Sequence, residues 1–298
     1  MKQAKSFLSV VTLIVTTASL CSTFVAENLF AEEAESAQAQ EPDALWYERE
    51  SVWNGYEQYH FTIADRPAYI VKPKSVAEGN PWIWRARFPG FHAEMDVVLL
   101  SKGFHIAYVD VSNMFGSPTA VEIGDEFYKY LTTDRQLARK PCLEGVSRGG
   151  LFVYNWAAKN PGKVACIYCD TPVCDFKSWP AGKGKGIGSP QSWQQCLQAY
   201  GFTEEQANEY THNPIDHAAI IAQAKIPLMH IVSENDRVVP PSENTYLSQS
   251  RLAEFDYPLE VISVKEGTEK SNGHHFTHPD PEHVVRFIEE HVIKSMKQ

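Results

Sequence analysis

Short hydrophobic runs alternate with longer amphipathic segments along most of the chain beyond residue 67. The short runs, several of them hydrophobic at consecutive positions, predict strands at 68–71, 82–88, 104–111, 141–146, 164–170, 226–232 and 259–264. Hydrophobic residues at helical spacing predict helices at 93–102, 121–137, 148–159, 242–255 and 282–294. Strands without a polar face are typical of a sheet that is covered on both sides. The pattern therefore predicts an α/β fold with a mostly parallel central sheet and helices on both faces.

The alternation is interrupted between two predicted strands, at 174–224. This segment has helical patterns of its own, such as 203–211, and a Gly-rich stretch at 181–188 that we interpret as a mobile loop. Open α/β sheets bind ligands beyond the carboxyl ends of their strands, and an insertion at this point would cover that edge. We therefore predict one domain at 43–298, without repeats or linkers, that includes a cap insertion at about 174–224.

Residues 1–42 are interpreted as a signal peptide followed by a leader tract. Lys2 and Lys5 precede an uncharged, apolar stretch that ends at Ala26, which is the order of charge and hydrophobicity in a signal peptide. A small-x-small cleavage site stands at 37–39, while cleavage nearer Ala26 and retention as an anchor are the alternatives. We expect an exported protein, periplasmic or extracellular, that is not stably embedded in a membrane after leader removal.

Composition and charge exclude several classes of protein. Of the 298 residues, 43% are hydrophobic and 21% charged, which excludes a collagen-like, coiled-coil or wholly disordered chain. The formal charge of −10 provides no electrostatic basis for binding nucleic acid, so we expect no nucleic-acid partner. Five cysteines beyond Cys21 are interpreted as buried thiols whose pairing the sequence leaves open: Cys142, Cys166, Cys169, Cys174 and Cys196.

The most specific motif is Gly145-Val146-Ser147-Arg148-Gly149, which ends one predicted strand and begins a predicted helix. In this strand–turn–helix context, the glycines leave room for a sharp turn that exposes the serine hydroxyl on a strained backbone. We therefore interpret Ser147 as a nucleophile rather than as part of an inert turn.

A nucleophilic serine requires a histidine that accepts its proton and an acid that orients the histidine. Asp236 follows the predicted strand 226–232, and two adjacent histidines, His274 and His275, follow the last predicted strand. The chain order is serine, acid, histidine, as in one known arrangement of such triads. Asp170, at the end of the strand 164–170, is the alternative acid.

With these motifs the sequence resembles the α/β-hydrolase superfamily, in particular its exported bacterial prolyl-oligopeptidase-like hydrolases and carbohydrate esterases. The resemblance extends from about Trp53 to the C-terminus and rests on segments 145–150, 235–240, 243–245 and 273–275. It implies Ser147 as nucleophile, Asp236 as acid and His274 as base, because members usually place the base directly after the glycine. His275 is the alternate base. No metal or cofactor is implied.

The oxyanion donors are less clearly marked, because the family's His-Gly-Gly-Gly motif is absent and segment 85–91 occupies its place. One donor is expected to be the backbone N–H of Arg148, and the second an N–H near Arg87 and Phe88. Arg85 and Arg87 share one face of a strand that should be buried, where a guanidinium needs an anionic partner. With Arg148 they would form a positive substrate pocket; the alternative is internal ion pairs with Asp110, Glu144 or Asp170.

Two further features point to a sugar substrate. The Ser147-Arg148 pair resembles the glucuronoyl esterases, which implies esters of uronic acids. Trp179 and Trp193 lie in the predicted cap, where they would stack on pyranose rings or form the core of the cap. We therefore expect a serine carboxylesterase acting on esterified polysaccharide, such as methyl or acetyl esters of pectin, through an acyl-enzyme.

Three alternatives remain. The same triad would serve a serine peptidase of prolyl-oligopeptidase type, although no propeller domain precedes the hydrolase segment in this sequence. A metal-dependent hydrolase would use His274, His275 and His278, together with His92 and Glu94. A non-catalytic carbohydrate-binding module is the third alternative, and the complete Ser-Asp-His set argues against it.

Overall fold

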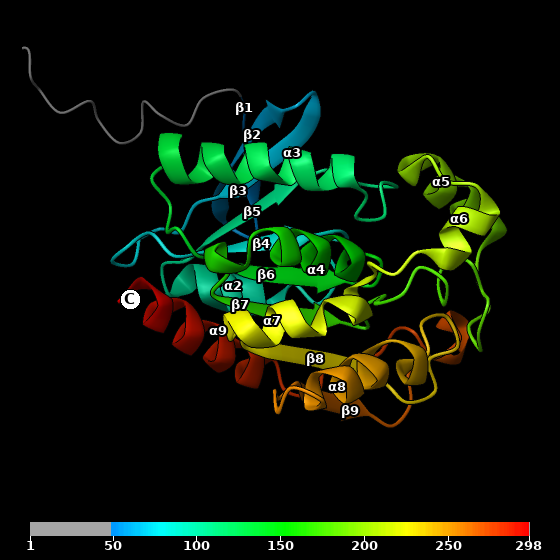
Figure 1. The fold of residues 1–298 in the computed structure, drawn as a ribbon. Coiled ribbons are helices and arrows are strands. Elements are labelled where there is room, and N and C mark those ends of the chain that lie inside the picture. The colour runs from blue at the N-terminus through cyan, green and yellow to red at the C-terminus, as the bar shows by residue number, and fades with distance from the viewer. Residues whose placement is uncertain (1–48, 298) are drawn as a thin grey trace, which may run out of the picture. The chain divides into compact units, whose positions relative to one another are not determined.

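The computed structural model describes residues 49–297, so the expected signal peptide and leader lie outside the described residues. Nine strands in this range form one sheet in the order β1-β2-β3-β5-β4-β6-β7-β8-β9 (Figure 1). The strands are β1 (Arg49–Trp53), β2 (Tyr56–Ile63), β3 (Arg66–Val71), β4 (Trp82–Ala86), β5 (His105–Val109), β6 (Cys142–Val146), β7 (Cys166–Asp170), β8 (Leu228–Ser233) and β9 (Glu260–Val264). The six strands from β4 to β9 pair in parallel, whereas β1, β2 and β3 pair antiparallel.

Helices cover both faces of the sheet, as the alternating pattern predicts (Figure 1). One face carries α2 (Glu94–Ser101) and α9 (Pro281–Met296). The other face carries α3 (Pro118–Lys129), α4 (Gly149–Lys159), α7 (Ala218–Ala224) and α8 (Thr245–Ala253). The prediction of a mostly parallel α/β sheet is therefore confirmed.

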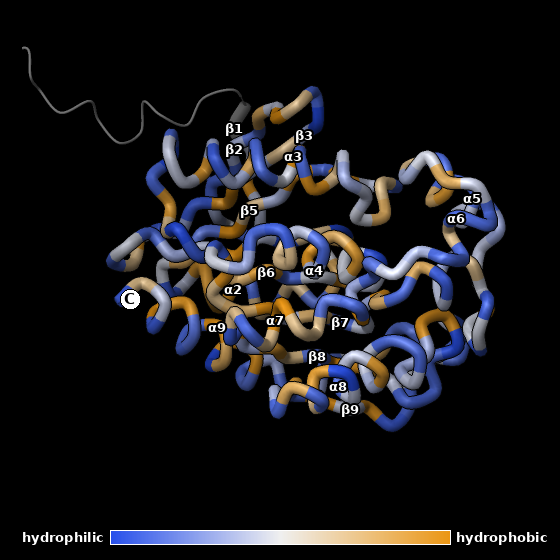
Figure 2. Tube along the Cα trace, in the orientation of Figure 1, coloured by the Kyte–Doolittle hydropathy of each residue, from blue (hydrophilic) through white to orange (hydrophobic). Residues whose placement is uncertain are grey.

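Each face has its own hydrophobic core. Beneath α2 and α9, Leu99 and Ile288 are fully buried against strand residues such as Ile106. On the other face, Trp84 packs against Phe127 of α3 and Trp156 of α4, with ring centroids 5.1 and 4.8 Å away. Figure 2 shows the corresponding concentration of hydrophobic residues along the central strands.

Two local features differ from the predicted pattern. The β1–β2 hairpin was not predicted, although Asn54-Gly55 at its turn has φ angles of 49° and 80°, which suit a two-residue hairpin turn. The helix predicted at 121–137 ends as an α-helix at Lys129 and continues as a π-helical turn over Tyr130–Asp134.

The segment between β7 and β8, with its predicted cap insertion, divides into two parts. Helices α5 (Pro190–Tyr200) and α6 (Glu204–Glu209) lie beyond the edge of the sheet at which α4 begins (Figure 1). They share a small core with Leu151 of α4 and with Phe115. A 3₁₀ turn (Pro214–His217) then leads into α7, which packs between α4 and α8 in the helical layer.

The Gly-rich loop at 181–188 is attached to the region around Asp236. Its Lys185 N–H donates to Glu243, and the Ile187 N–H donates to the carbonyl of Arg237 over 2.9 Å.

The five cysteines in the described range are buried and unpaired, as expected. Burial raises the pKa of the Cys174 and Cys196 thiols to about 12, so these groups stay protonated. Within residues 49–297 no helix is both long and apolar enough to cross a membrane.

Candidate active site

Ser147 occupies the sharp turn between β6 and α4 and has a φ of 52°, in the left-handed region that L-residues rarely adopt. Its N–H donates to the carbonyl of Asp170 over 2.8 Å, which fixes the turn to the end of β7. Gly149 permits this geometry, because a Cβ there would lie 2.2 Å from the carbonyl oxygen of Ala86. The turn thus holds a half-exposed hydroxyl at the carboxyl edge of the sheet.

His274 and Asp236 meet Ser147 at this edge in one hydrogen-bonded chain. The Nε2 of His274 lies 3.0 Å from the Ser147 hydroxyl, and its Nδ1 lies 2.6 Å from Asp236 Oδ2. The carboxylate requires a donor, so Nδ1 carries a proton and Nε2 of the neutral ring accepts from Ser147. The arrangement is that of a serine with an oriented general base.

The loops that carry Asp236 and His274 fix each other. The other carboxylate oxygen of Asp236 accepts from the N–H groups of Val238 and Val239, at 2.8 and 2.9 Å. Gly273 has a φ of 85° and approaches Asn235 so closely that a Cβ would lie 2.2 Å from its carbonyl oxygen. These contacts hold the acid and the histidine in place before any ligand binds.

The alternates of the triad lie in different surroundings. His275 is exposed, and its ring packs 5.1 Å from that of Phe91. Asp170 contacts His92 instead of His274, through His92 Nδ1. His92 Nε2 lies 2.8 Å from the carbonyl oxygen of Phe276, so both ring nitrogens face acceptors and both must donate. Burial lowers the pKa of His92, but the hydrogen bond to Asp170 and its charge outweigh burial and raise it.

Arg85 lies buried beneath the candidate active site rather than at its surface. It is 1% exposed, and its guanidinium contacts Asp96 on α2 at 2.5 Å and Glu144 on β6 at 3.1 Å. The structure therefore corrects the expectation that Arg85 binds substrate. The physical reason is that the buried face of β4 needs a counter-charge for the guanidinium, and Asp96 and Glu144 supply it.

Arg87 and Arg148, by contrast, stay at the carboxyl edge. Arg87 donates to the Ser112 hydroxyl over 2.8 Å, and Arg148 donates to the Asn113 side chain over 3.2 Å. Arg87 and Phe88 both have positive φ, 68° and 44°, which ends β4 two residues earlier than predicted. Burial, and then the charge of Arg87, lower the pKa of Arg148 to about 10.

The two predicted sugar-stacking tryptophans differ in position. Trp179 is buried but lies under Arg148, whose Cζ is 5.0 Å from its ring centroid, so it belongs to the surroundings of Ser147. Trp193 packs on Phe176 in the core beneath α5, and its indole N–H donates to Glu204 over 2.6 Å. The expectation that Trp193 stacks on a substrate is therefore corrected, because its ring is buried in the hydrophobic core beneath α5 and α6.

Comparisons with known proteins bear on the fold. No family model matches the sequence, and no curated protein matches it either. Solved structures do match. The Pyrococcus horikoshii acylaminoacyl peptidase has a TM-score of 0.57 at 14% identity, covering 81% of this chain and 43% of its own. The Porphyromonas gingivalis dipeptidyl peptidase 4 has a TM-score of 0.59 at 14% identity, and the match covers 80% of this chain and 36% of the peptidase. A Mycobacterium tuberculosis puromycin-hydrolyzing peptidase has a TM-score of 0.58 at 16% identity, and the match covers 87% of this chain and 41% of that peptidase.

The chain has the α/β-hydrolase fold. It spans about two fifths of the length of these solved structures. In an α/β-hydrolase fold the serine of a Gly-x-Ser-x-Gly turn stands at the top of the sheet, which is where the structure places Ser147.

The histidine nitrogens at this edge of the α/β-hydrolase fold already have hydrogen-bond partners, which disfavours the metal alternative. His274 uses both ring nitrogens on Asp236 and Ser147, and His92 uses both on Asp170 and Phe276. His278 donates through Nε2 toward Tyr168, at 3.1 Å, and accepts the Asp280 N–H at Nδ1. Within residues 49–297 no group of three or more His, Cys, Asp or Glu side chains converges as metal ligands.

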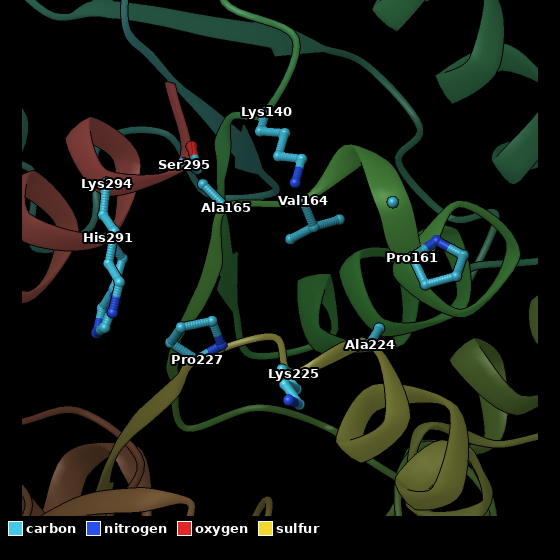
Figure 3. Close-up of a pocket in the computed structure, with 11 residues that line it drawn as sticks. Lys140, Pro161, Val164, Ala165, Ala224, Lys225, Pro227, His291, Lys294 and Ser295 are labelled. Atoms are coloured by element: carbon cyan, nitrogen blue, oxygen red, sulfur yellow. The ribbon is translucent and has the colours of Figure 1, made fainter. Parts of the chain in front are cut away.

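A cavity of about 560 Å³ lies at the opposite edge of the sheet, before the starts of β6, β7 and β8 (Figure 3). Lys140, Lys225 and Lys294 are among its lining residues, which include none of the triad candidates. The carboxyl edge therefore remains the candidate active site of this α/β-hydrolase fold.

The His92–Asp170 contact is the part of the site that sequence reasoning missed. The sequence assigns the two residues separate roles, His92 as a metal ligand and Asp170 as an alternative acid. A signal was present in the sequence, because Asp170 ends a strand that is buried at every position and thus requires a cationic or hydrogen-bonding partner.

Proposed function

We propose that the chain is a serine hydrolase that works through an acyl-enzyme on Ser147. The observation that carries the proposal is the continuous hydrogen-bonded chain from Ser147 through His274 to Asp236, on a serine with positive φ. The Ser147 oxygen attacks a carbonyl carbon while His274 Nε2 takes its proton. His274 then gives that proton to the leaving group. To release the acyl group, His274 takes a proton from the attacking water and returns it to the Ser147 oxygen.

The buried Asp236 keeps the proton of His274 on Nδ1 and stabilises the imidazolium that forms during each transfer. The backbone N–H of Arg148 is proposed as one oxyanion donor, together with an N–H from the Arg87–Phe88 turn. Gly149 brings that turn against the start of α4, since Arg87 Cβ would lie 3.2 Å from a Cβ at this glycine.

Between an amide and an ester as the bond that is cleaved, we favour the amide, in the manner of the prolyl-oligopeptidase type. The support is that the solved structures similar in fold are named as peptidases, although the likeness itself concerns the fold. Hydrolysis of a carboxylic ester, for example on an esterified polysaccharide, is the second candidate. It is supported by the Arg87 and Arg148 side chains, which both lie over the Phe88 ring, and by Trp179 beneath Arg148.

The test is covalent labelling of the purified protein with a fluorophosphonate, read by mass spectrometry at the modified peptide. We expect one label on Ser147, none in Ser147→Ala, and full labelling in the matched variant Ser295→Ala on α9. In parallel, Ser147→Ala should lose about four decades of kcat on 4-nitrophenyl acetate and on N-acetyl amino-acid 4-nitroanilides. The ratio of the two activities in the wild-type protein separates amidase from esterase. Labelling elsewhere, or activity that survives Ser147→Ala, would overturn the proposal.

A further inference from the structure

Two guanidinium groups at the candidate active site share one aromatic surface and carry no ion pair with any residue that the structure describes. The Cζ of Arg87 lies 4.6 Å from the centroid of the Phe88 ring, and the Cζ of Arg148 lies 5.6 Å from the same centroid. Phe115 and Trp179 complete the aromatic surroundings of Arg148, at 5.9 and 5.0 Å. Within residues 49–297 no carboxylate oxygen lies within 4.0 Å of either guanidinium.

A shortage of acidic residues does not explain why these two arginines lie close together without a carboxylate partner. The chain has 37 acidic residues against 27 lysines and arginines, and Arg85, two positions before Arg87, contacts two carboxylates. Holding two like charges close together in a partly buried site is unfavourable. Burial and the charge of Arg87 lower the pKa of Arg148, as expected for two cations that face a common space. An anion that binds between them would remove this cost.

The hydrogen-bonding capacity of the two groups is also incompletely used. Each guanidinium has five N–H donors. Arg87 uses Nη1 on Ser112, while its Nε is buried and has no hydrogen-bond partner among residues 49–297. Arg148 uses Nη1 on the exposed Asn113. Donors therefore remain on both side chains, and Arg148 directly follows Ser147 in the sequence.

We propose that Arg87 and Arg148 form an anion subsite and that the substrate carries a carboxylate close to the bond that Ser147 attacks. A carboxylate is planar and singly charged, so it matches a guanidinium fork and suits a surface that is partly aromatic. This inference rests on the proposed hydrolase function and adds a substrate class to it.

The first experiment compares matched esters. Neutral 4-nitrophenyl acetate is set against mono-4-nitrophenyl glutarate, with the acid on the acyl side, and 4-acetoxy-3-nitrobenzoate, with the acid on the leaving group. We expect wild-type kcat/KM to favour one of the anionic esters by about tenfold or more, since charge-assisted hydrogen bonds have this strength. Arg87→Gln and Arg148→Gln should each lower that ratio by about tenfold, and the matching lysine variants by less. Using the ratio cancels losses common to all esters.

Arg286→Gln is the matched control, because it removes one exposed positive charge on α9. It should leave the ratio unchanged, whereas added salt should lower the ratio in the wild-type protein. A wild-type enzyme that hydrolyses the neutral ester but prefers neither anionic ester would overturn the subsite and leave the hydrolase proposal intact. Equal losses of all three esters in the arginine variants would overturn it as well.

A binding measurement covers the case in which no ester is hydrolysed. Ser147→Ala protein is titrated calorimetrically with monoethyl glutarate and with diethyl glutarate. Tighter binding of the monoanion, lost by about tenfold when Arg148→Gln or Arg87→Gln is added, supports the subsite even if the proposed catalysis fails. Equal binding of the two compounds, or a preference that survives both arginine substitutions, overturns it.

Discussion

The adjacent histidines His274 and His275 have opposite environments. His274 is 7% exposed and has both ring nitrogens engaged, whereas His275 is exposed and packs on Phe91. Burial, and then the neighbouring His274, lower the pKa of His275. Of these two histidines, His274 alone combines a fixed ring with an acid partner, as a general base requires.

Replacing each histidine in turn separates their roles. His274→Ala should lower kcat by about three to four decades or more, close to the loss in Ser147→Ala, because residues of one triad act as a unit. His275→Ala should cost less than about tenfold, since its ring does not contact Ser147. Steady-state kinetics on 4-nitrophenyl acetate measure both. The opposite order would assign the base to His275.

The two candidate acids form a second matched pair. Asp236→Asn should keep the loop geometry but cost about two to four decades of kcat, because the amide cannot stabilise the imidazolium of His274. Asp170→Asn removes the charge beside His92 instead. It should cost less activity, and it should lower the thermal stability, since the His92 cation bridges Asp170 and the carbonyl of Phe276. A larger kinetic loss in Asp170→Asn than in Asp236→Asn would contradict this assignment.

Three elements are joined beneath the site by one buried ionic cluster, formed by Arg85 of β4, Asp96 of α2 and Glu144 of β6. Burial raises the pKa of both carboxyl groups, more than Arg85 lowers them. For Arg85, burial lowers the pKa, but the two neighbouring carboxyl groups outweigh burial and raise it. The guanidinium also donates to the carbonyl of Phe91, 2.5 Å away, which ties the loop before α2 to the sheet.

Removing the cation should therefore be costly. Arg85→Met leaves two carboxyl groups buried without a counter-charge and should lower the free energy of unfolding by about 3–5 kcal/mol. The matched variant Arg87→Met changes a half-buried residue that has no ion pair within the described part of the chain, and it should cost less than about 1 kcal/mol. Urea unfolding at neutral pH measures both. Near-native stability of Arg85→Met would show that the cluster does not support the sheet.

Elements with strong local signals could be predicted from the sequence, and contacts between distant elements could not. The seven predicted strands and the turn at Ser147 follow from continuous hydrophobic runs and from two glycines at fixed spacing. Asp236 and His274 could be placed at the same edge because each follows a parallel strand. The partners of Arg85 are harder to predict. The sequence offers Glu144 as one partner, but Asp96 lies on a helix whose pattern does not mark one buried acid.

The β1–β2 hairpin shows a different limit. Its strands lie at the antiparallel edge of the sheet, and most side chains of β2 are only partly buried, so the hydrophobic signal is weak. Asn54-Gly55 was the available signal. Similarly, Trp193 could not be assigned to core or substrate from sequence, because that depends on how α5 packs against Phe176.

The stability of the folded domain as a whole is linked to pH through His230, on β8, the strand next to the edge strand β9. The ring is fully buried on β8, with Nε2 2.7 Å from Tyr154 Oη of α4 and Nδ1 3.0 Å from Thr245 Oγ1 of α8. Burial lowers its pKa to about 3. The unfolded chain protonates this residue near pH 6.5, so it binds more protons than the folded protein below that pH.

The sign of the linkage follows from this difference. The stabilising contribution of His230 is fully present above about pH 6.5 and decreases as the pH falls toward the folded-state pKa, reaching a loss of about 2 kcal/mol at pH 5. His230→Gln removes the titrating group. The difference in unfolding free energy between the wild-type protein and this variant should therefore shrink by about 2 kcal/mol between pH 7.5 and pH 5, as measured by urea unfolding at each pH. His105→Gln should behave in the same direction, because burial lowers the pKa of His105 to about 4. A difference that stays constant over this range would contradict the prediction, because folded His230 would then take up its proton as readily as the unfolded chain does.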